Sequence, residues 1–240
     1  MGNYMKANEA MTDREMMDQW LVVEFGRNNA PRFSGNAPSD ATGAVGFVYV
    51  DSLCGITFNV EAWSKTDGNS FQIISRLGDT GLMLLLRYDI FAKYGKRLLT
   101  PSEQASFDLP TYPDWLSVYY EGEETMRALR ALPLLDPFRA HGYPDDIECR
   151  LSDEAGLQAK GEEWVWVKVC QQEGDGLFIG KLLNEPLLDF GVHAGEMVYV
   201  DVSERKGCLV AVCLGSVAVL EKSFKSARCI QSPRCGNLSS

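Results

Sequence analysis

The feature of this sequence that most constrains its fold is a succession of short apolar segments in its second half. Each segment has the length and the β-branched composition of a strand, and residues typical of tight turns, such as Glu173–Gly176 and Glu204–Gly207, separate them. Short strands at this spacing predict a small β-barrel or a strongly curled sheet. The predicted strands are Ile147–Leu151, Trp164–Cys170, Leu177–Leu183, Glu196–Val202 and Cys208–Leu214, with a further strand at Val217–Leu220.

Strand patterns also occur in the first half of the chain. Residues Ile56–Trp63 alternate apolar and polar side chains, and the turn residues Asp51–Gly55 separate them from the β-branched segment Val45–Val50. These two segments predict a hairpin. The segment Phe71–Leu77 extends the hairpin to an antiparallel meander.

Four helices are predicted around this sheet. Residues 12–15 (TDRE) form a capping box, and apolar residues at helical spacing continue this helix through Val23 towards Gly26. Residues 100–103 (TPSE) form a second capping box, with proline at its preferred first-turn position. A third predicted helix is Glu121–Leu132, which Pro133 stops. The segment Asp79–Lys96 fits two interpretations, because the continuous apolar residues Leu82–Leu86 are also typical of a buried strand; we favour a helix that ends near Gly95, since the apolar pattern extends too far for one strand.

A change of composition separates the two halves. Residues Pro133–Asp145 have the proline and glycine content of a linker. We therefore predict an α+β protein, with an N-terminal antiparallel sheet with helices and a C-terminal small β-barrel-like module. The predicted domains are an α+β domain at 1–135 and a β-rich module at 142–230, followed by a disordered tail at 231–240.

The chain is acidic, with 23 Lys and Arg residues against 33 Asp and Glu residues and a formal net charge of −10. No cluster of basic residues is visible, and binding to nucleic acid or to an anionic membrane requires clustered cations. We therefore expect neither as a partner, whereas a basic protein partner would be steered towards such a surface. The alternative is that the charge serves solubility alone.

The seven cysteines are odd in number and form no C-x-x-C motif. This pattern argues against a disulfide framework and against a tetrahedral zinc site. The chain shows neither a secretory signal nor an apolar segment long enough to span a membrane. We therefore expect reduced thiols in a cytoplasmic protein that has no metal site and no cofactor.

Residues 176–202 carry the most information. Proline cannot donate to a strand ladder, so the predicted strand must end at Asn184-Glu185-Pro186. The next apolar residues, Leu187, Leu188 and Phe190, are expected to form a plug over the sheet. Gly195 suits a turn with positive φ before the following strand.

Polar side chains are expected to tie this crossover together. Asn184 and His193 can both form hydrogen bonds from their side chains to the backbone. His193 is one of only two histidines in the chain, the other being His141. A single histidine in a loop more often has such a structural role than a catalytic one.

Four stretches of the second half resemble a family of small bacterial β-modules. They are Gly142–Ile147 (GYPDDI), Trp164–Val169 (WVWVKV), Gly180–Pro186 (GKLLNEP) and Phe190–Glu196 (FGVHAGE). The resemblance covers residues 142–203. Such modules are found in immunity proteins, which neutralise toxins delivered between competing bacteria. The resemblance therefore implies a non-enzymatic binding protein that occludes the active site of a toxin, and it implies no catalytic residues.

The candidate site is a partner-binding surface on this module. Trp164 and Trp166 share one face of their predicted strand. We expect their indoles to be buried against the first domain; if they are exposed instead, they are natural hot spots for a protein partner. The candidate partner-binding residues are Trp164, Trp166, Asn184, Glu185, Asp189 and His193.

Two other functions stay open. The first is a hydrolase-like enzyme with a non-standard site between the domains, built on Cys54, His141 or His193. The second is a structural or regulatory homo-oligomer that uses the face of Trp164 and Trp166. The adjacent carboxylates Asp145-Asp146 and Glu162-Glu163 are expected to be solvated.

Overall fold

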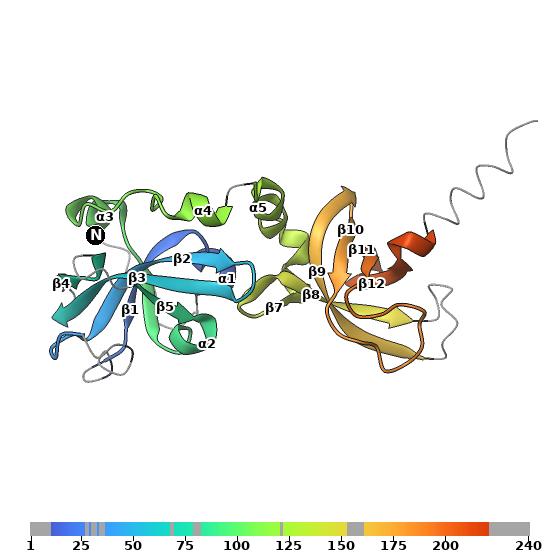
Figure 1. Ribbon diagram of the computed structural model, residues 1–240, viewed down its shortest axis with the longest axis horizontal. Helices are drawn as coiled ribbons and strands as arrows, with labels where there is room; N and C mark the ends of the chain where they lie inside the picture. Colours follow the sequence, from blue (N-terminus) through green and yellow to red (C-terminus); the bar gives the residue numbers. More distant parts are fainter. Residues whose placement is uncertain are drawn as a thin grey trace, which may run out of the picture. The chain divides into compact units, whose positions relative to one another are not determined.

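The computed structural model describes residues 11–26, 29, 33, 37–67, 70–78, 83–120, 122–152 and 161–220. Its contacts divide the chain into two compact units (Figure 1). Unit 1 comprises Met1–Glu124 and His141–Pro144, and unit 2 comprises Thr125–Ala140 and Asp145–Ser240. Residues 125–135, which we assigned to the first domain, thus belong to unit 2. The predicted tail at 231–240 lies outside the described residues.

Unit 1 is built on one antiparallel sheet with the strand order β4-β3-β2-β1-β6, and β5 also pairs with β3. The hairpin predicted around residues 51–55 is confirmed, because β2 and β3 pair from Gly43↔Ser64 to Asp51↔Gly55. The pairing of β4 with β3 confirms the predicted meander. The strands are β1 (Gln19–Glu24), β2 (Gly43–Asp51), β3 (Gly55–Asp67), β4 (Ser70–Arg76), β5 (Leu84–Arg87) and β6 (Gly95–Leu98).

Both faces of this sheet are covered. One face, with Val48 and Phe58, packs against Phe91 of a short helix, and the other, with Phe47 and Tyr49, packs against Leu116 and its neighbours. Strand β2 is therefore buried from Gly43 to Val50, as in sheets that are covered on both sides. The helices of this unit are α1 (Asp13–Met16), α2 (Tyr88–Phe91), α3 (Pro101–Ser106) and α4 (Leu116–Tyr120).

The two capping boxes are confirmed, but two of the predicted helices are wrong. The helix after Thr12 ends at Met16, and the next residues form β1 because Trp20–Val23 are all buried in the middle of a sheet covered on both faces. A continuous apolar segment of this kind fits a buried strand as well as a helix. The segment Asp79–Lys96 likewise contains β5, α2 and the start of β6, with residues 79–82 outside the described part.

Unit 2 is a five-stranded closed barrel, as the predicted strand succession indicated. Its strands form a meander, and β12 closes the barrel by pairing with β8 at Val212↔Arg150. The first and fifth strands of such a meander run in the same direction, so the closing pair is parallel. The strands are β8 (Tyr143–Ser152), β9 (Glu162–Gly174), β10 (Leu177–Leu182), β11 (Met197–Arg205) and β12 (Cys208–Ser216), with a short β7 (Arg139–Ala140) beside β8.

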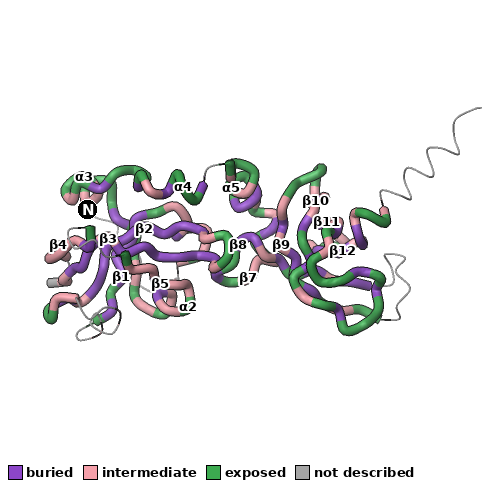
Figure 2. Tube along the Cα trace, viewed as in Figure 1, coloured by how far each residue is buried: buried purple, intermediate pink, exposed green. Residues whose placement is uncertain are grey.

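Segments at both ends of the barrel contribute side chains to its core. At the end where β8 begins, helix α5 (Glu124–Arg130) and a 3-10 helix (Pro133–Phe138) contribute Leu129 and Leu135 to the core. The loop between β10 and β11 contributes Phe190 and Val192. The buried residues of both units are shown in purple in Figure 2. Residues 217–220 are helical instead of a sixth strand, because the closed barrel leaves β12 no free edge.

The carboxylates at 145 and 146 are not solvated as we had expected. Arg130 donates from Nε to Asp145 Oδ1 and from Nη2 to Asp145 Oδ2, both at 2.8 Å, and each side chain is only 7% exposed. Asp146 is half-buried, and burial raises its pKa. The Arg130–Asp145 pair thus joins α5 to β8, the first strand of the barrel.

Candidate functional site: the tryptophan face of the barrel

The two tryptophans of β9 lie on the outer surface of the barrel. Val165, Val167 and Val169 point into its core, so Trp164 and Trp166 point outwards by the alternation of the strand. Trp164 is 54% exposed and Trp166 is 37% exposed. The barrel itself therefore leaves both indoles uncovered.

The loop between β10 and β11 is attached to β9 directly beside these tryptophans. The Leu183 N–H donates to the Trp166 carbonyl at 2.8 Å, and the Trp166 N–H donates to Asn184 Oδ1 at 2.7 Å. The Asn184 side chain thus takes the place of a ladder partner after β10 has ended. The predicted role of Asn184 in tying the crossover together is confirmed.

Glu185 and His193 join the two ends of the same loop. His193 Nδ1 lies 2.7 Å from Glu185 Oε1, and the Ala194 N–H donates to Glu185 Oε2 at 2.8 Å. The hydrogen bond with Glu185 raises the pKa of His193, and the same contact lowers the pKa of Glu185. We predicted a contact from the His193 side chain to the backbone, but this side chain contacts Glu185 instead. The contact to the backbone of the loop is made by Glu185.

Glu163 is a further anchor that the sequence did not predict. Its carboxylate accepts from the N–H of Leu187 at 2.9 and 2.8 Å and from the N–H of Leu188 at 3.2 Å. The expectation that Glu162 and Glu163 are merely solvated is wrong, since Glu162 also pairs with Arg150 at 3.2 Å. The position of Glu163 in the sequence could have indicated this role. Glu163 lies two residues before Val165 at the start of β9, so its side chain is on the same inward-facing side of the strand.

The predicted apolar plug is only partly correct. Phe190 is buried in the barrel core, but Leu187 is 92% exposed and Leu188 is 41% exposed. Asp189 is exposed as well, and its Oδ1 accepts from the Gly191 N–H at 3.1 Å, where Gly191 has φ +68. The exposed apolar side chains of β9 and of the loop bonded to it are here called the tryptophan face: Trp164, Trp166, Leu183, Leu187 and Leu188.

The alternative catalytic residues are divided between the two units. Cys54 lies in the β2–β3 turn, where its N–H donates to Asp51 Oδ1 at 3.0 Å. His141 is exposed and belongs to unit 1 with Cys54, whereas His193 belongs to unit 2. Among the described residues of unit 1, no hydrogen bond or ion pair joins Cys54 to His141.

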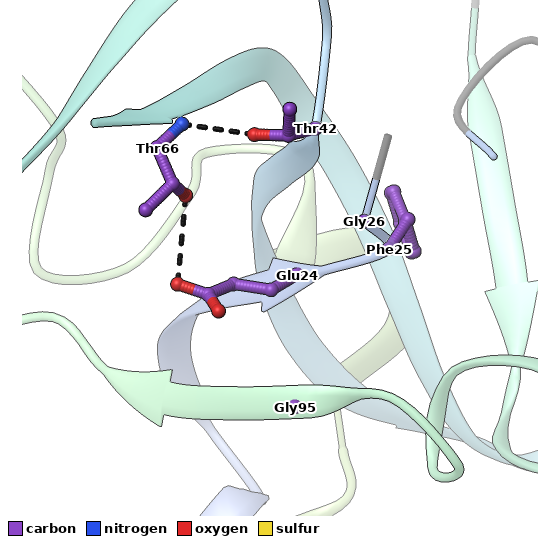
Figure 3. Close-up of a pocket in the computed structure, with 6 residues that line it drawn as sticks. All are labelled: Glu24, Phe25, Gly26, Thr42, Thr66 and Gly95. Carbon is purple, nitrogen blue, oxygen red and sulfur yellow. Dashed lines mark hydrogen bonds between the residues drawn. The ribbon is translucent and has the colours of Figure 1, made fainter. Parts of the chain in front are cut away.

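A hollow of about 400 Å³ opens at one end of the unit 1 sheet (Figure 3). Of the residues that line it, only Glu24 is ionisable. Glu24 Oε1 accepts from Thr66 Oγ1 at 3.5 Å, and the Thr66 N–H donates to Thr42 Oγ1 at 2.9 Å. These contacts join three of the lining residues to one another, and they suggest no particular ligand.

Metal-ligand groups and membrane-spanning helices are likewise absent from the described residues. No three His, Cys, Asp or Glu residues within the described ranges are grouped so that they could hold a metal ion. Among the same residues, no helix is both long enough and apolar enough to cross a membrane. Comparison of the chain with protein-family models, with curated proteins and with solved structures found no match. The fold and the site together describe a two-unit α+β protein with an exposed apolar face on a small barrel.

Proposed function

We propose that this chain is a non-enzymatic binding protein that neutralises a toxin by covering its active site with the tryptophan face. The observation that carries this proposal is the exposure of Trp164 and Trp166 side by side on one strand. Tryptophan is enriched among the few interface residues that supply most of the binding energy. The resemblance of residues 142–203 to modules of immunity proteins points to the same class.

The face is held in place before any partner arrives. Asn184 and Glu163 attach the loop to β9, and Glu185 joins the two ends of the loop. A surface that is already ordered loses less conformational entropy on binding, so more of the contact energy remains as affinity. This rigidity supports a role in tight binding.

Charge supports a basic partner. The chain carries a net charge of −10, and Glu185 and Asp189 lie exposed in the loop that contributes to the face. An acidic surface accelerates the encounter with a basic protein. We further propose a cytoplasmic location, in which the free thiols of the described cysteines stay reduced.

The test is co-expression with the product of the neighbouring gene. We expect a stable complex and protection of the cell, both lost when Trp164 and Trp166 are changed together to alanine. Leu53→Ala is the control, because Leu53 is an exposed apolar residue of unit 1 and lies outside the tryptophan face. No complex and no protection with the unchanged chain would contradict the proposal.

A second candidate is a homo-oligomer formed through the same face. The observation that favours it is the exposed apolar surface itself, since contiguous apolar patches often mark contacts between proteins. Light scattering separates the two candidates. A dimer mass that reverts to a monomer on changing both tryptophans to alanine would favour the homo-oligomer.

A further inference from the structure

Strand β9 extends beyond the strand that pairs with it. Strand β10 follows β9 only as far as Leu182, which lies opposite Val167, so residues 162–166 continue past its end. At Trp166 the loop between β10 and β11 supplies the hydrogen bonds that a paired strand would make, through the Leu183 N–H and the Asn184 side chain. The loop thus extends the pairing by one residue.

Trp164 presents its main-chain N–H and C=O to the same side as Trp166. Residues two apart in an antiparallel strand direct these groups alike, and the β8–β9 register runs without a bulge from Asp146↔Lys168 to Ser152↔Glu162. Within the residues that the structure describes, no hydrogen bond to these two groups is found. Among the described residues, one residue of strand edge is therefore open beside two exposed indoles.

Charged side chains flank these indoles. Glu148 lies directly opposite Trp166 on β8 and is exposed on the same outer surface. Arg150 lies directly opposite Trp164, and it pairs with Glu162, the preceding outward-facing residue of β9. A cation over an indole is attracted by the ring face, and a carboxylate beside the ring binds the same cation. Arginine suits this arrangement better than lysine, because its planar guanidinium stacks on an aromatic ring.

We propose that this corner of the barrel binds an extended, arginine-bearing segment of a basic protein, which pairs with Trp164 and stacks a guanidinium on Trp166 beside Glu148. This inference rests on the proposed function and specifies the chemistry of its partner. Main-chain pairing fixes the position of the segment, as in other cases of strand addition. The indoles and Glu148 then select arginine at alternate positions, where its side chains reach the outer face.

A short peptide tests this without any knowledge of the partner. The probe is acetyl-Arg-Val-Arg-Val-Arg-amide, titrated into the full chain while the tryptophan indole N–H resonances are followed by NMR. We expect saturable shifts of Trp164 and Trp166. Replacing arginine by citrulline removes the charge and should weaken binding about tenfold. An analogue N-methylated at its three central amides should weaken binding as well, because it cannot pair with the strand edge.

Protein variants locate the contact. Glu148→Lys should weaken peptide binding about tenfold, since it replaces an attraction by a repulsion. Glu173→Lys, at the far end of β9, is the matched control and should bind as the unchanged chain does. The inference is overturned if millimolar peptide leaves both indoles unshifted, or if the citrulline analogue or Glu148→Lys gives equal affinity.

This experiment also separates the inference from the proposed function. Peptide binding without capture or neutralisation of a toxin would contradict the proposed function and leave the arginine site standing. Toxin capture through the tryptophans without any peptide response would overturn the arginine site alone.

Discussion

At the scale of single residues, glycines and one buried ion pair fix the local geometry of both units. Gly142 adopts φ +79, and a Cβ at this position would lie 2.6 Å from Tyr88 Cγ. Its N–H donates to Asp13 Oδ2 at 2.7 Å, and its carbonyl accepts from the Ile56 N–H at 2.7 Å. The chain is therefore attached to unit 1 at this residue by contacts that only glycine permits.

Gly142→Ala should lower the free energy of unfolding of unit 1 by about 2–3 kcal/mol, through the strained φ and the clash with Tyr88. Gly95→Ala is the control, because a Cβ at Gly95 meets nothing within 4 Å and should change stability by less than about 0.5 kcal/mol. Urea unfolding of both variants measures the difference. Equal stabilities would show that residue 142 tolerates a side chain.

The ion pair of Arg130 and Asp145 allows a second prediction at this scale. Asp145→Asn leaves a buried guanidinium without its counter-charge and should destabilise unit 2 by about 3–5 kcal/mol. Asp40→Asn breaks an exposed pair with Lys65 and should cost no more than about 1 kcal/mol. Chemical denaturation checks both. A small effect of Asp145→Asn would mean that water reaches Arg130.

At the scale of elements, the loop between β10 and β11 depends on a few side chains that reach backbone groups. The Glu163 carboxylate accepts hydrogen bonds from two consecutive N–H groups. Asn184 continues the hydrogen bonding along β9, and Glu185 joins the two ends of the loop. Gly191 and Gly195, with φ +68 and +89, permit its turns. The position of the exposed leucines therefore follows from polar contacts rather than from apolar packing.

Glu163→Ala should accelerate hydrogen exchange at Leu187 and Leu188 by about tenfold, because each amide loses its carboxylate acceptor. Glu162→Ala is the matched control, since Glu162 pairs with Arg150 at the surface and not with the loop. Exchange followed by mass spectrometry or NMR measures the effect. Similar exchange in both variants would exclude Glu163 as the anchor.

The pair of Glu185 and His193 gives the loop a pH dependence. The pKa of His193 is higher in the folded protein than in the unfolded chain. The stabilisation that His193 gives to the loop is therefore complete below the unfolded pKa and is lost as the pH rises through the folded pKa. The pKa of Glu185 is lower in the folded protein than in the unfolded chain, so the stabilisation that Glu185 gives to the loop is lost as the pH falls through the folded pKa. The pair therefore stabilises the loop most between these two pKa values.

Titration of the His193 ring by NMR tests this assignment. Glu185→Gln should lower the pKa of His193, because it removes the hydrogen-bonded carboxylate. Glu196→Gln should lower it less, since Glu196 and Asp189 act on the ring only through space and more weakly than Glu185 does. An unchanged pKa in Glu185→Gln would contradict the contact.

At the scale of the whole molecule, sequence patterns predicted local turns and strand pairs better than long-range packing. The hairpins, the capping boxes and the barrel strands follow from short-range signals, because turn chemistry and alternation are local. Residues 20–23 were predicted as helix because burial on both faces of a sheet removes the alternation that identifies a strand. The exposure of Trp164 and Trp166 could not be predicted, since it depends on what covers their strand.

The central claim is that the tryptophan face is free in the isolated protein and becomes covered by a protein partner. The chain contains five tryptophans, and 5-fluorotryptophan labelling reports on each by 19F NMR. We predict that the resonances of Trp164 and Trp166 show a solvent isotope shift in D₂O, unlike those of the buried Trp20 and Trp63, and that partner binding abolishes it. Isotope shifts of Trp164 and Trp166 that persist unchanged in the complex would contradict the account.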